Sequence, residues 1–449
     1  MKKWLIVLIF ALVFCLAVFA FAFGKMFFTD SEEIVDDKNT IDQIELTFWR
    51  NSGNEAFNKA YEELVADFEA AHPKIVINMQ TMNWANEYEL RLRTELAAGN
   101  YPDIMTIDSP TLALYANSGA LLSIDQYMKE EGNIDDISQP TLKGLTFEGE
   151  FFLAPITEPS IALFYNRYLF KEAGIPFPSA DPDNPLTWDE VLDIALQITN
   201  IEKGVYGIDP AQGFSEGEGP AYFKLPILWQ FGAEALSPDG TTADRYLNSD
   251  EALEALQFYQ DLYHKHQVAT VELPSGAFET GKLAMTILGS WHLSELEGYT
   301  NFTLGEDFGI APLPKGKYQV APNGGWALGI SSRTNYPDEA WEFIKFMTSY
   351  EGIKKFVEIT GEIPARYSVA NDIAELNEYP KNIFVQQGQK YSKNRPVTPA
   401  YSVVSHSIKL LFEDVGMDGK DVEAAAVKAV ERIDRGIEEL LESSASIVP

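Results

Sequence analysis

The alternation of strand-like and helix-like segments most constrains what this chain of 449 residues can fold into. Residues 44–49 (IELTFW) have a strand pattern, and residues 56–71 place apolar side chains on one helical face. A second strand pattern (KIVINMQ), a second helix over residues 87–98 and a short strand (DIMTI) follow. Strands that alternate with helices in this way are typical of parallel sheets covered by helices. We therefore expect an α/β fold.

The same alternation begins again after Pro155. Residues 161–166 have a strand pattern, and Thr187 with Glu190 has the spacing of a capping box, which begins a helix. Amphipathic helices are predicted further on, over residues 337–348 and 422–442. The restart predicts a second α/β unit.

The N-terminus has the pattern of a targeting segment. Lys2 and Lys3 precede an uncharged, mostly apolar stretch over residues 4–23. We interpret residues 1–24 as a signal peptide or a membrane anchor and the acidic residues 25–40 as a linker. Cys15 leaves lipidation as a third interpretation, although Phe14 before it is large for that processing. Each interpretation predicts an exported protein, periplasmic or at the cell surface.

Charge and composition exclude several classes of protein. The chain has 67 acidic and 34 basic residues, a formal net charge of −33. Such a surface repels nucleic-acid phosphates and anionic lipid. A single cysteine excludes an intrachain disulfide framework and a cysteine-rich zinc site. No zinc-protease, nucleophile-elbow, P-loop or dinucleotide motif occurs, so we expect no enzyme, no metal and no cofactor.

Tryptophan placement points to binding. Five tryptophans lie near predicted strand ends, helix starts or turns, namely Trp49, Trp84, Trp229, Trp291 and Trp326. For each of them, core packing is the alternative interpretation. Several together favour an aromatic-lined cleft, because an indole offers a broad apolar face to the C–H groups of a sugar ring.

Six segments in order resemble one protein family. They are RLRTELAAGNYPDIMTIDSPTLALYANSGALLSID, LFYNRYLFKEAGIPFP with LTWDEVLDIALQI, FETGKLAMTILGSW, FGIAPLPKG, GGWALGISSRTNYPDEAWEFIKFMTS and GEIPARYS. The chain from about residue 41 onward thereby resembles the extracellular sugar-binding proteins of ABC importers, the solute-binding family that includes maltose-binding protein. It departs from many relatives in lacking a clear lipobox cysteine.

The resemblance implies a two-lobed periplasmic-binding-protein-like fold with a ligand cleft between the lobes and interleaved crossings. Lobe 1 would comprise residues 41–156 plus 316–362, and lobe 2 residues 157–315 plus 363–449. Ligand contacts are expected from both lobes and from the first crossing, namely from Trp49, Asn51, Trp84, Asp108, Glu158, Trp229, Trp291, Trp326, Arg366 and Tyr401. The alternative for Asp108 is a helix cap, and the alternative for Arg366 is a pair with a carboxylate.

The implied function is that of a monomeric receptor, which captures a carbohydrate, expected to be an oligosaccharide, by aromatic stacking and hinge closure. It would deliver the sugar to the permease of an ABC importer. Two alternatives remain open. One is a secreted glycoside hydrolase, whose signature is a pair of carboxylates across a cleft. The other is a receptor for a non-sugar solute such as a peptide or a polyamine, for which a carboxylate-rich cleft would favour a cation.

Overall fold

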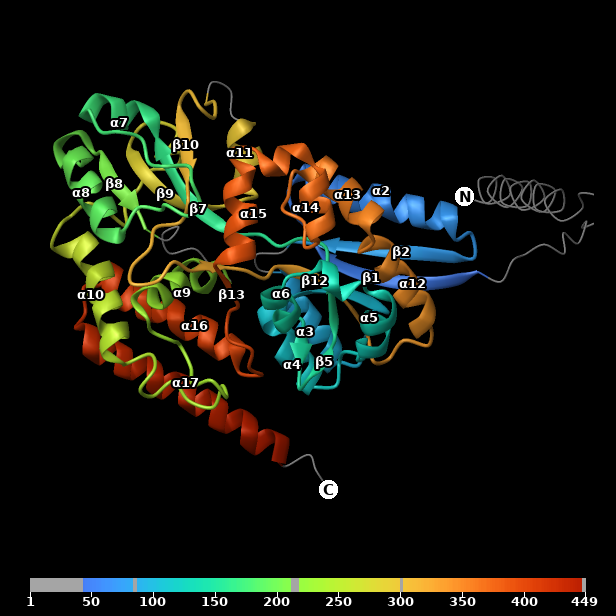
Figure 1. Cartoon of the computed structure of the whole chain (residues 1–449). Helices are drawn as coiled ribbons and strands as arrows, with labels where there is room; N and C mark the ends of the chain where they lie inside the picture. The colour runs from blue at the N-terminus through green and yellow to red at the C-terminus, as the bar shows by residue number, and fades with distance from the viewer. Residues whose placement is uncertain (1–42, 84–86, 211–217, 299–301, 446–449) are drawn as a thin grey trace, which may run out of the picture. The chain divides into compact units, whose positions relative to one another are not determined.

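The computed structural model describes residues 43–83, 87–210, 218–298 and 302–445 (Figure 1). The predicted targeting segment, the acidic linker and Trp84 lie outside the described residues. Within the described ranges, no helix combines the length and the apolar character that a membrane span requires.

The first sheet has five strands in the order β2-β1-β3-β12-β6. Its strands are β1 (Ile44–Asn51), β2 (Ile75–Met82), β3 (Ile104–Asp108), β6 (Leu153–Pro155) and β12 (Trp326–Ile330). Strand β1 runs parallel to β2 and β3, whereas β12 runs antiparallel to β3 and β6. The register of β3 and β12 puts Trp326 opposite Asp108, so two predicted ligand contacts meet at one edge of the sheet.

Helices cover this sheet through aromatic packing. They include α2 (Glu55–Ala71), α3 (Glu89–Ala97), α12 (Pro337–Met347) and α13 (Tyr350–Thr360). Phe343 of α12 packs edge-on against Phe48 of the sheet and Phe68 of α2, with ring centroids 5.4 and 5.1 Å away. Figure 1 shows α2 and α13 beside each other.

The second sheet has four strands in the order β10-β7-β9-β8. They are β7 (Ile161–Asn166), β8 (Tyr206–Asp209), β9 (Leu283–Gly289) and β10 (Phe308–Ala311). Its helices include α8 (Trp188–Ile198), α9 (Gly219–Phe231), α10 (Asp250–His264), α16 (Tyr401–Phe412) and α17 (Val422–Ala445). The predicted capping box is confirmed, because Thr187 accepts from the Glu190 amide at the start of α8 and the Glu190 side chain accepts from the Thr187 amide.

The α/β class is confirmed, but the expected parallel sheets prove to be mixed, because each contains parallel and antiparallel pairs. Strand β7 is antiparallel to both of its neighbours, and β12 is antiparallel to both of its own. The physical reason is the route of the chain. Strands β7 and β12 each enter a sheet directly from the other one, without the helical crossover that a parallel connection needs.

The chain passes between the two sheets at three crossings, which contact one another. At the first and third, Glu158 N donates to Ile363 O (2.8 Å) and Ala365 N to Ile156 O (3.0 Å). At the second, β11 (Ala321–Pro322) pairs with β13 (Ser392–Lys393). We call the parts of the chain around the first and second sheets the first and second lobes. The predicted lobe limits stay a prediction, since one buried cluster holds residues of both sheets, including Phe48 and Phe164.

Gly324, which lies between β11 and β12, has a backbone that favours glycine. Its φ is +84°, and an added Cβ would lie 2.5 Å from Ser109 Oγ. Gly324→Ala should therefore lower the free energy of unfolding by about 1–2 kcal/mol, measured by urea denaturation. The control is Gly388→Ala within α15 (Lys381–Lys390), where an added Cβ meets nothing within 4 Å. That variant should be as stable as the unchanged chain or more so. Equal stability of the two variants would contradict the prediction.

Candidate ligand-binding site

An ion pair joins the end of β3 to the segment after β13. Arg395 Nη2 lies 2.9 Å from Asp108 Oδ1, and Nη1 lies 3.3 Å from Oδ2, so the guanidinium binds the carboxylate through two bonds. Both side chains are buried. Asp108 was expected to accept from ligand hydroxyls or to cap a helix. Instead its carboxylate binds Arg395, and it makes no side-chain capping bond to the short helix that follows β3.

Arg395 also binds a carboxylate of the second lobe. Its Nη1 lies 2.9 Å from Oε1 of Glu218, at the start of α9. Glu218 in turn accepts from the hydroxyls of Tyr401 and of Ser405, one turn apart on α16. We call Asp108, Glu218, Arg395 and Tyr401 the interlobe cluster. Tyr401 is buried and donates to Glu218, so the structure gives its hydroxyl a protein partner in place of the predicted ligand contact.

The electrostatics of the interlobe cluster keep the arginine charged. Burial alone would lower the pKa of Arg395, but Asp108, Tyr401 and Glu218 together raise it well above its usual value. Burial raises the pKa of the Glu218 carboxyl, and the Arg395 charge opposes that rise. The arginine is therefore shared between carboxylates of the two lobes.

Glu158 lies at the first crossing beside this cluster. Its Oε1 accepts from Gly324 N at 2.6 Å, and its Oε2 accepts from Thr141 Oγ1 at 2.5 Å. Burial raises the pKa of Glu158, whereas those two hydrogen bonds and Arg395 oppose the rise. Glu158, Thr141, Gly324 and Trp326 line a small cavity. Trp326 is half-buried and meets Tyr88 edge-on at 5.6 Å.

The second lobe contributes three aromatic rings in contact, those of Trp291, Tyr222 and Phe223, which we call the aromatic wall. Trp291 is half-buried, with ring centroids 5.9 Å from Tyr222 and 6.2 Å from Phe223. An added Cβ on Gly289 would lie 2.3 Å from the indole, so the ring lies against bare backbone. Tyr222 also contacts the guanidinium of Arg395, 4.9 Å from its centroid. Contacts thus run from Trp291 through Tyr222 to Arg395, which donates to Gly324 O at 3.0 Å, two residues before Trp326.

Glu362, at the third crossing, was not predicted from the sequence. Burial raises the pKa of its carboxyl to about 7, and Lys381 and the Ser290 hydroxyl oppose the rise. Its charge also acts on Tyr222, together with those of Asp108 and Glu158. Arg395 and Glu218 were missed as well. They lie outside any recognisable motif, and Arg395 is 287 residues away from its partner Asp108.

Two predicted contacts prove to be structural. Trp229 is only 2% exposed and belongs to the second-lobe core, which was its alternative interpretation. Arg366 is buried, and its nitrogens donate to Thr348 O (2.6 Å), Asn133 O (3.1 Å) and Gly132 O (2.9 Å). It also pairs with Asp136 at 3.6 Å, the alternative foreseen for it. Protein thus surrounds the apolar ring of Trp229 and the polar group of Arg366, so both residues have structural roles, and a ligand role for either stays a prediction.

Trp49 and Asn51 end strand β1 and are both buried. Asn51 Oδ1 accepts from Thr106 Oγ1 at 3.0 Å, and Asn51 N donates to the same hydroxyl at 3.2 Å, so this residue fixes β1 to β3. Arg91 lies over the Trp49 ring at 5.9 Å. Tyr88 connects Trp49 to Trp326, because its hydroxyl donates to Trp49 O at 3.1 Å and its ring meets the Trp326 ring at 5.6 Å.

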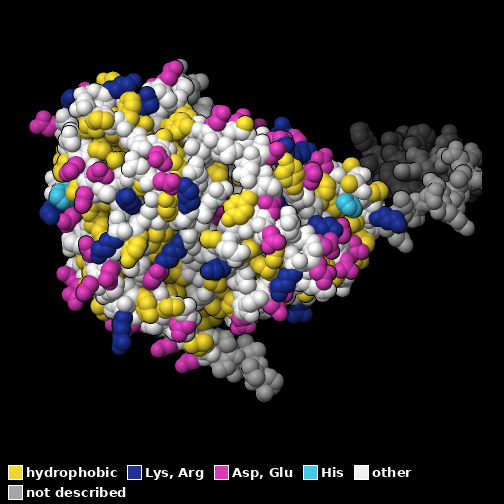
Figure 2. Space-filling view, viewed as in Figure 1, with side chains coloured by type: hydrophobic (Ala, Val, Ile, Leu, Met, Phe, Trp, Pro, Cys, Tyr) yellow, Lys and Arg dark blue, Asp and Glu magenta, His cyan; other side chains and the backbone are white. Residues whose placement is uncertain are grey.

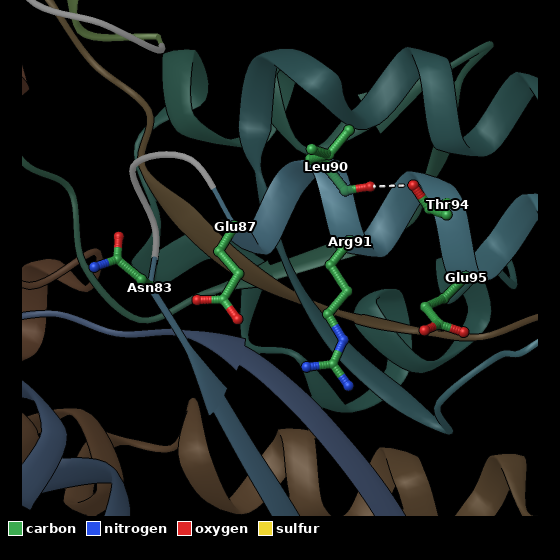
Figure 3. A pocket seen from close by; sticks show the side chains of 6 residues that line it. All are labelled: Asn83, Glu87, Leu90, Arg91, Thr94 and Glu95. Atoms are coloured by element: carbon green, nitrogen blue, oxygen red, sulfur yellow. Dashed lines mark hydrogen bonds between the residues drawn. The ribbon is translucent and has the colours of Figure 1, made fainter.

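Arg91 also lines an open groove along α3 (Figure 3). The residues around this groove are Asn83, Glu87, Leu90, Arg91, Thr94 and Glu95. Leu90 is 67% exposed, and the other five residues around the groove are polar or charged. Among the described residues, no group of three or more His, Cys, Asp or Glu side chains is arranged to hold a metal ion.

The structural role of Arg366 gives a prediction. Arg366→Lys should lower the free energy of unfolding by about 2 kcal/mol. The lysine ammonium cannot reach all three carbonyls that the arginine guanidinium binds, so carbonyl groups are left buried without a donor. Ligand affinity should not change. Chemical denaturation and calorimetric titration measure the two quantities. A variant of normal stability with weakened binding would return Arg366 to the list of ligand contacts.

Comparisons with known proteins agree with this architecture. A family model described as bacterial extracellular solute-binding protein matches residues 52–354. The maltotriose-binding protein of Pyrococcus abyssi is 24% identical over 84% of this chain and 79% of its own length. The sn-glycerol-3-phosphate-binding periplasmic protein of Escherichia coli K12 is 25% identical over 79% of this chain and 82% of its own.

A solved structure extends the likeness to the fold. The ABC transporter solute-binding protein of Thermotoga lettingae, bound with alpha-D-tagatose, superposes with a TM-score of 0.75 at 25% identity. The match covers 88% of this chain and 99% of that one. The predicted family and the two-lobed α/β fold are confirmed.

Proposed function

Because the chain belongs to the bacterial extracellular solute-binding protein family, we propose that it is an exported receptor for a carbohydrate. The sugar would bind between the lobes and pass to the permease of an ABC importer. The observation that carries the proposal is the half-buried pair of tryptophans, Trp291 of the second lobe and Trp326 of the first, with buried polar groups between them. Ligand contacts from both lobes favour closure, because a ligand shifts an equilibrium only by its differential affinity for the two forms.

Charge favours a neutral ligand over a phosphate ester. Arg395, the arginine of the interlobe cluster, is already bound to Asp108 and Glu218. Glu158 and Glu362 lie nearby, so an incoming phosphate would meet more carboxyl groups than free cations. Acidic side chains are also spread over the surface visible in Figure 2, among fewer lysines and arginines. Hydroxyl groups need no counter-charge, so an uncharged saccharide fits this site better than glycerol 3-phosphate does.

We propose that the bound sugar leaves chemically unchanged. A glycoside hydrolase needs one carboxyl group to protonate the leaving oxygen and a second to attack or to activate water. Asp108 and Glu218 are bound to Arg395, and Glu158 accepts from Gly324 and Thr141. These contacts hold both oxygens of Asp108 and Glu158 against protein donors, which suits binding more than catalysis. No metal or cofactor is required for this role.

Export follows from the family, and attachment is part of the proposal. The apolar segment over residues 4–23 would direct export, and it would then either be cleaved or hold the receptor at the membrane through the acidic linker. The receptor would act as a monomer.

A thermal-shift screen tests the proposed function. The probes are maltose, maltotriose, D-tagatose, sn-glycerol 3-phosphate and spermidine. A ligand at a hundred times its Kd stabilises the native form by about 2.7 kcal/mol, so binding should raise the Tm measurably. At least one saccharide should do so and be recovered intact. A rise with glycerol 3-phosphate or spermidine alone, or release of saccharide fragments, would overturn the proposal.

A further inference from the structure

Asn323 carries a buried amide without a protein partner. The residue is only 1% exposed, and neither Oδ1 nor Nδ2 has a hydrogen-bond partner among the described residues. Most buried polar side-chain atoms are hydrogen-bonded, because burial without a partner is unfavourable. The oxygen and the nitrogen of this side-chain amide are therefore both buried without a partner, which is unfavourable for the folded protein.

The position of Asn323 is at the second crossing. Asn323 N donates to Lys393 O at 3.2 Å, which holds its backbone to the strand before Arg395. The next residue, Gly324, donates to Glu158 and accepts from Arg395. Asn323 thus follows β11 directly in sequence and precedes the turn that leads to Trp326.

A second set of contacts links this position to Trp291. The residue before Asn323 is Pro322, whose carbonyl accepts from Ser160 Oγ at 3.4 Å. Ser160 O accepts from Ser290 N at 3.0 Å, and Ser290 directly precedes Trp291. The segment that carries Asn323 is therefore connected through Ser160 to the segment that carries Trp291, and it leads, three residues on, to Trp326.

We infer that the Asn323 amide is a hydrogen-bonding contact for hydroxyl groups of the bound sugar, uncovered when the lobes separate. An amide offers an acceptor oxygen and two donor hydrogens, and each sugar hydroxyl both donates and accepts. One side chain can thus bind two adjacent hydroxyls. A site built to bind a hydroxyl also discriminates against analogues that lack it, because its own polar group is then left unpaired. The inference rests on the proposed function and names a specificity residue within it.

The test compares Asn323→Ala with the unchanged full-length chain. Removing an unpartnered amide should leave the free protein as stable as before or more so, while affinity for the saccharide falls about thirty-fold. If Asn323 had only a structural role, Asn323→Ala would be less stable than the unchanged chain and would keep its affinity for the saccharide. The matched control is Asn382→Ala in α15, which also has a buried Oδ1 without a partner in the described chain and should keep full affinity.

Titration calorimetry with maltose, maltotriose and D-tagatose gives the affinities. If none of the three binds the unchanged chain, the proposed function fails and this inference falls with it. If one binds and Asn323→Ala binds it equally tightly, only the inference is overturned. Asn323→Ser replaces the alanine variant if that one does not fold. It keeps one donor and one acceptor, so its affinity should lie between those of asparagine and alanine, and unchanged affinity would again count against the inference.

Discussion

Trp291→Ala is expected to lose about thirty-fold or more of its affinity for the saccharide that binds, measured by titration calorimetry. The indole lies against Gly289 and is supported by Tyr222 and Phe223, so its position is set before ligand arrives. Truncation removes a preorganised apolar face, and the hydroxyl-binding groups alone cannot replace it. Because the ring is half-buried, the variant should remain folded, with a cooperative unfolding transition.

The matched control is Tyr168→Ala in α7 (Arg167–Ala173) of the same lobe. Tyr168 is 65% exposed and lies outside the site, so its removal should change neither affinity nor stability appreciably. Trp326→Ala provides the corresponding test in the first lobe. Unaltered affinity in the Trp291 variant would remove that residue from the site and leave the aromatic wall a packing feature.

Arg395→Met is expected to lower the free energy of unfolding by about 3–5 kcal/mol, measured by chemical denaturation. The substitution keeps an apolar side chain of similar length but leaves the buried Asp108 and the half-buried Glu218 without their shared counter-ion. Lys390→Met is the control, because Lys390 pairs with Asp183 at 2.8 Å on the exposed surface. Such exposed pairs contribute about 0–1 kcal/mol, so that variant should remain near normal stability.

The cause of the Arg395 effect can be separated from lost packing. Adding Asp108→Asn and Glu218→Gln to Arg395→Met removes the two unpaired charges, so most of the lost stability should return. Without these additions, Arg395→Met should be more stable at pH 5 than at pH 8. Burial already raises the Glu218 pKa. When the pKa of a carboxyl group is higher in the folded state than in the unfolded state, the folded protein loses stability as the pH rises. A pH-independent loss that the triple variant does not recover would contradict the electrostatic explanation.

Local patterns predicted local structure well. The Thr187 capping box is a four-residue signal, and the helix it begins is present. The spacing of apolar residues likewise located α2 and α12. Strand direction was not predictable in this way. It depends on whether the chain enters a sheet through a helix or from the other lobe, and no pattern within β7 or β12 records that route.

The site shows the same division between local and long-range information. Whether Trp229 faces the cleft or the core could not be decided from the sequence, because α9 is buried on nearly every side and has no polar face to orient its tryptophan. Arg395 and Asp108 are neighbours only through the fold, as are Glu158 and Gly324. Family resemblance located the region of the site, but which carboxylates are already occupied by protein had to come from the structure.

The sharing of Arg395 between Asp108 and Glu218 has a consequence for release of the cargo. One carboxylate belongs to the first lobe and the other to the second, so the lobes cannot part without withdrawing the guanidinium from one of them. This ion pair therefore stabilises the closed form of the receptor even when no ligand is bound. Release of the ligand therefore requires this ion pair to separate, in addition to the contacts with the ligand itself.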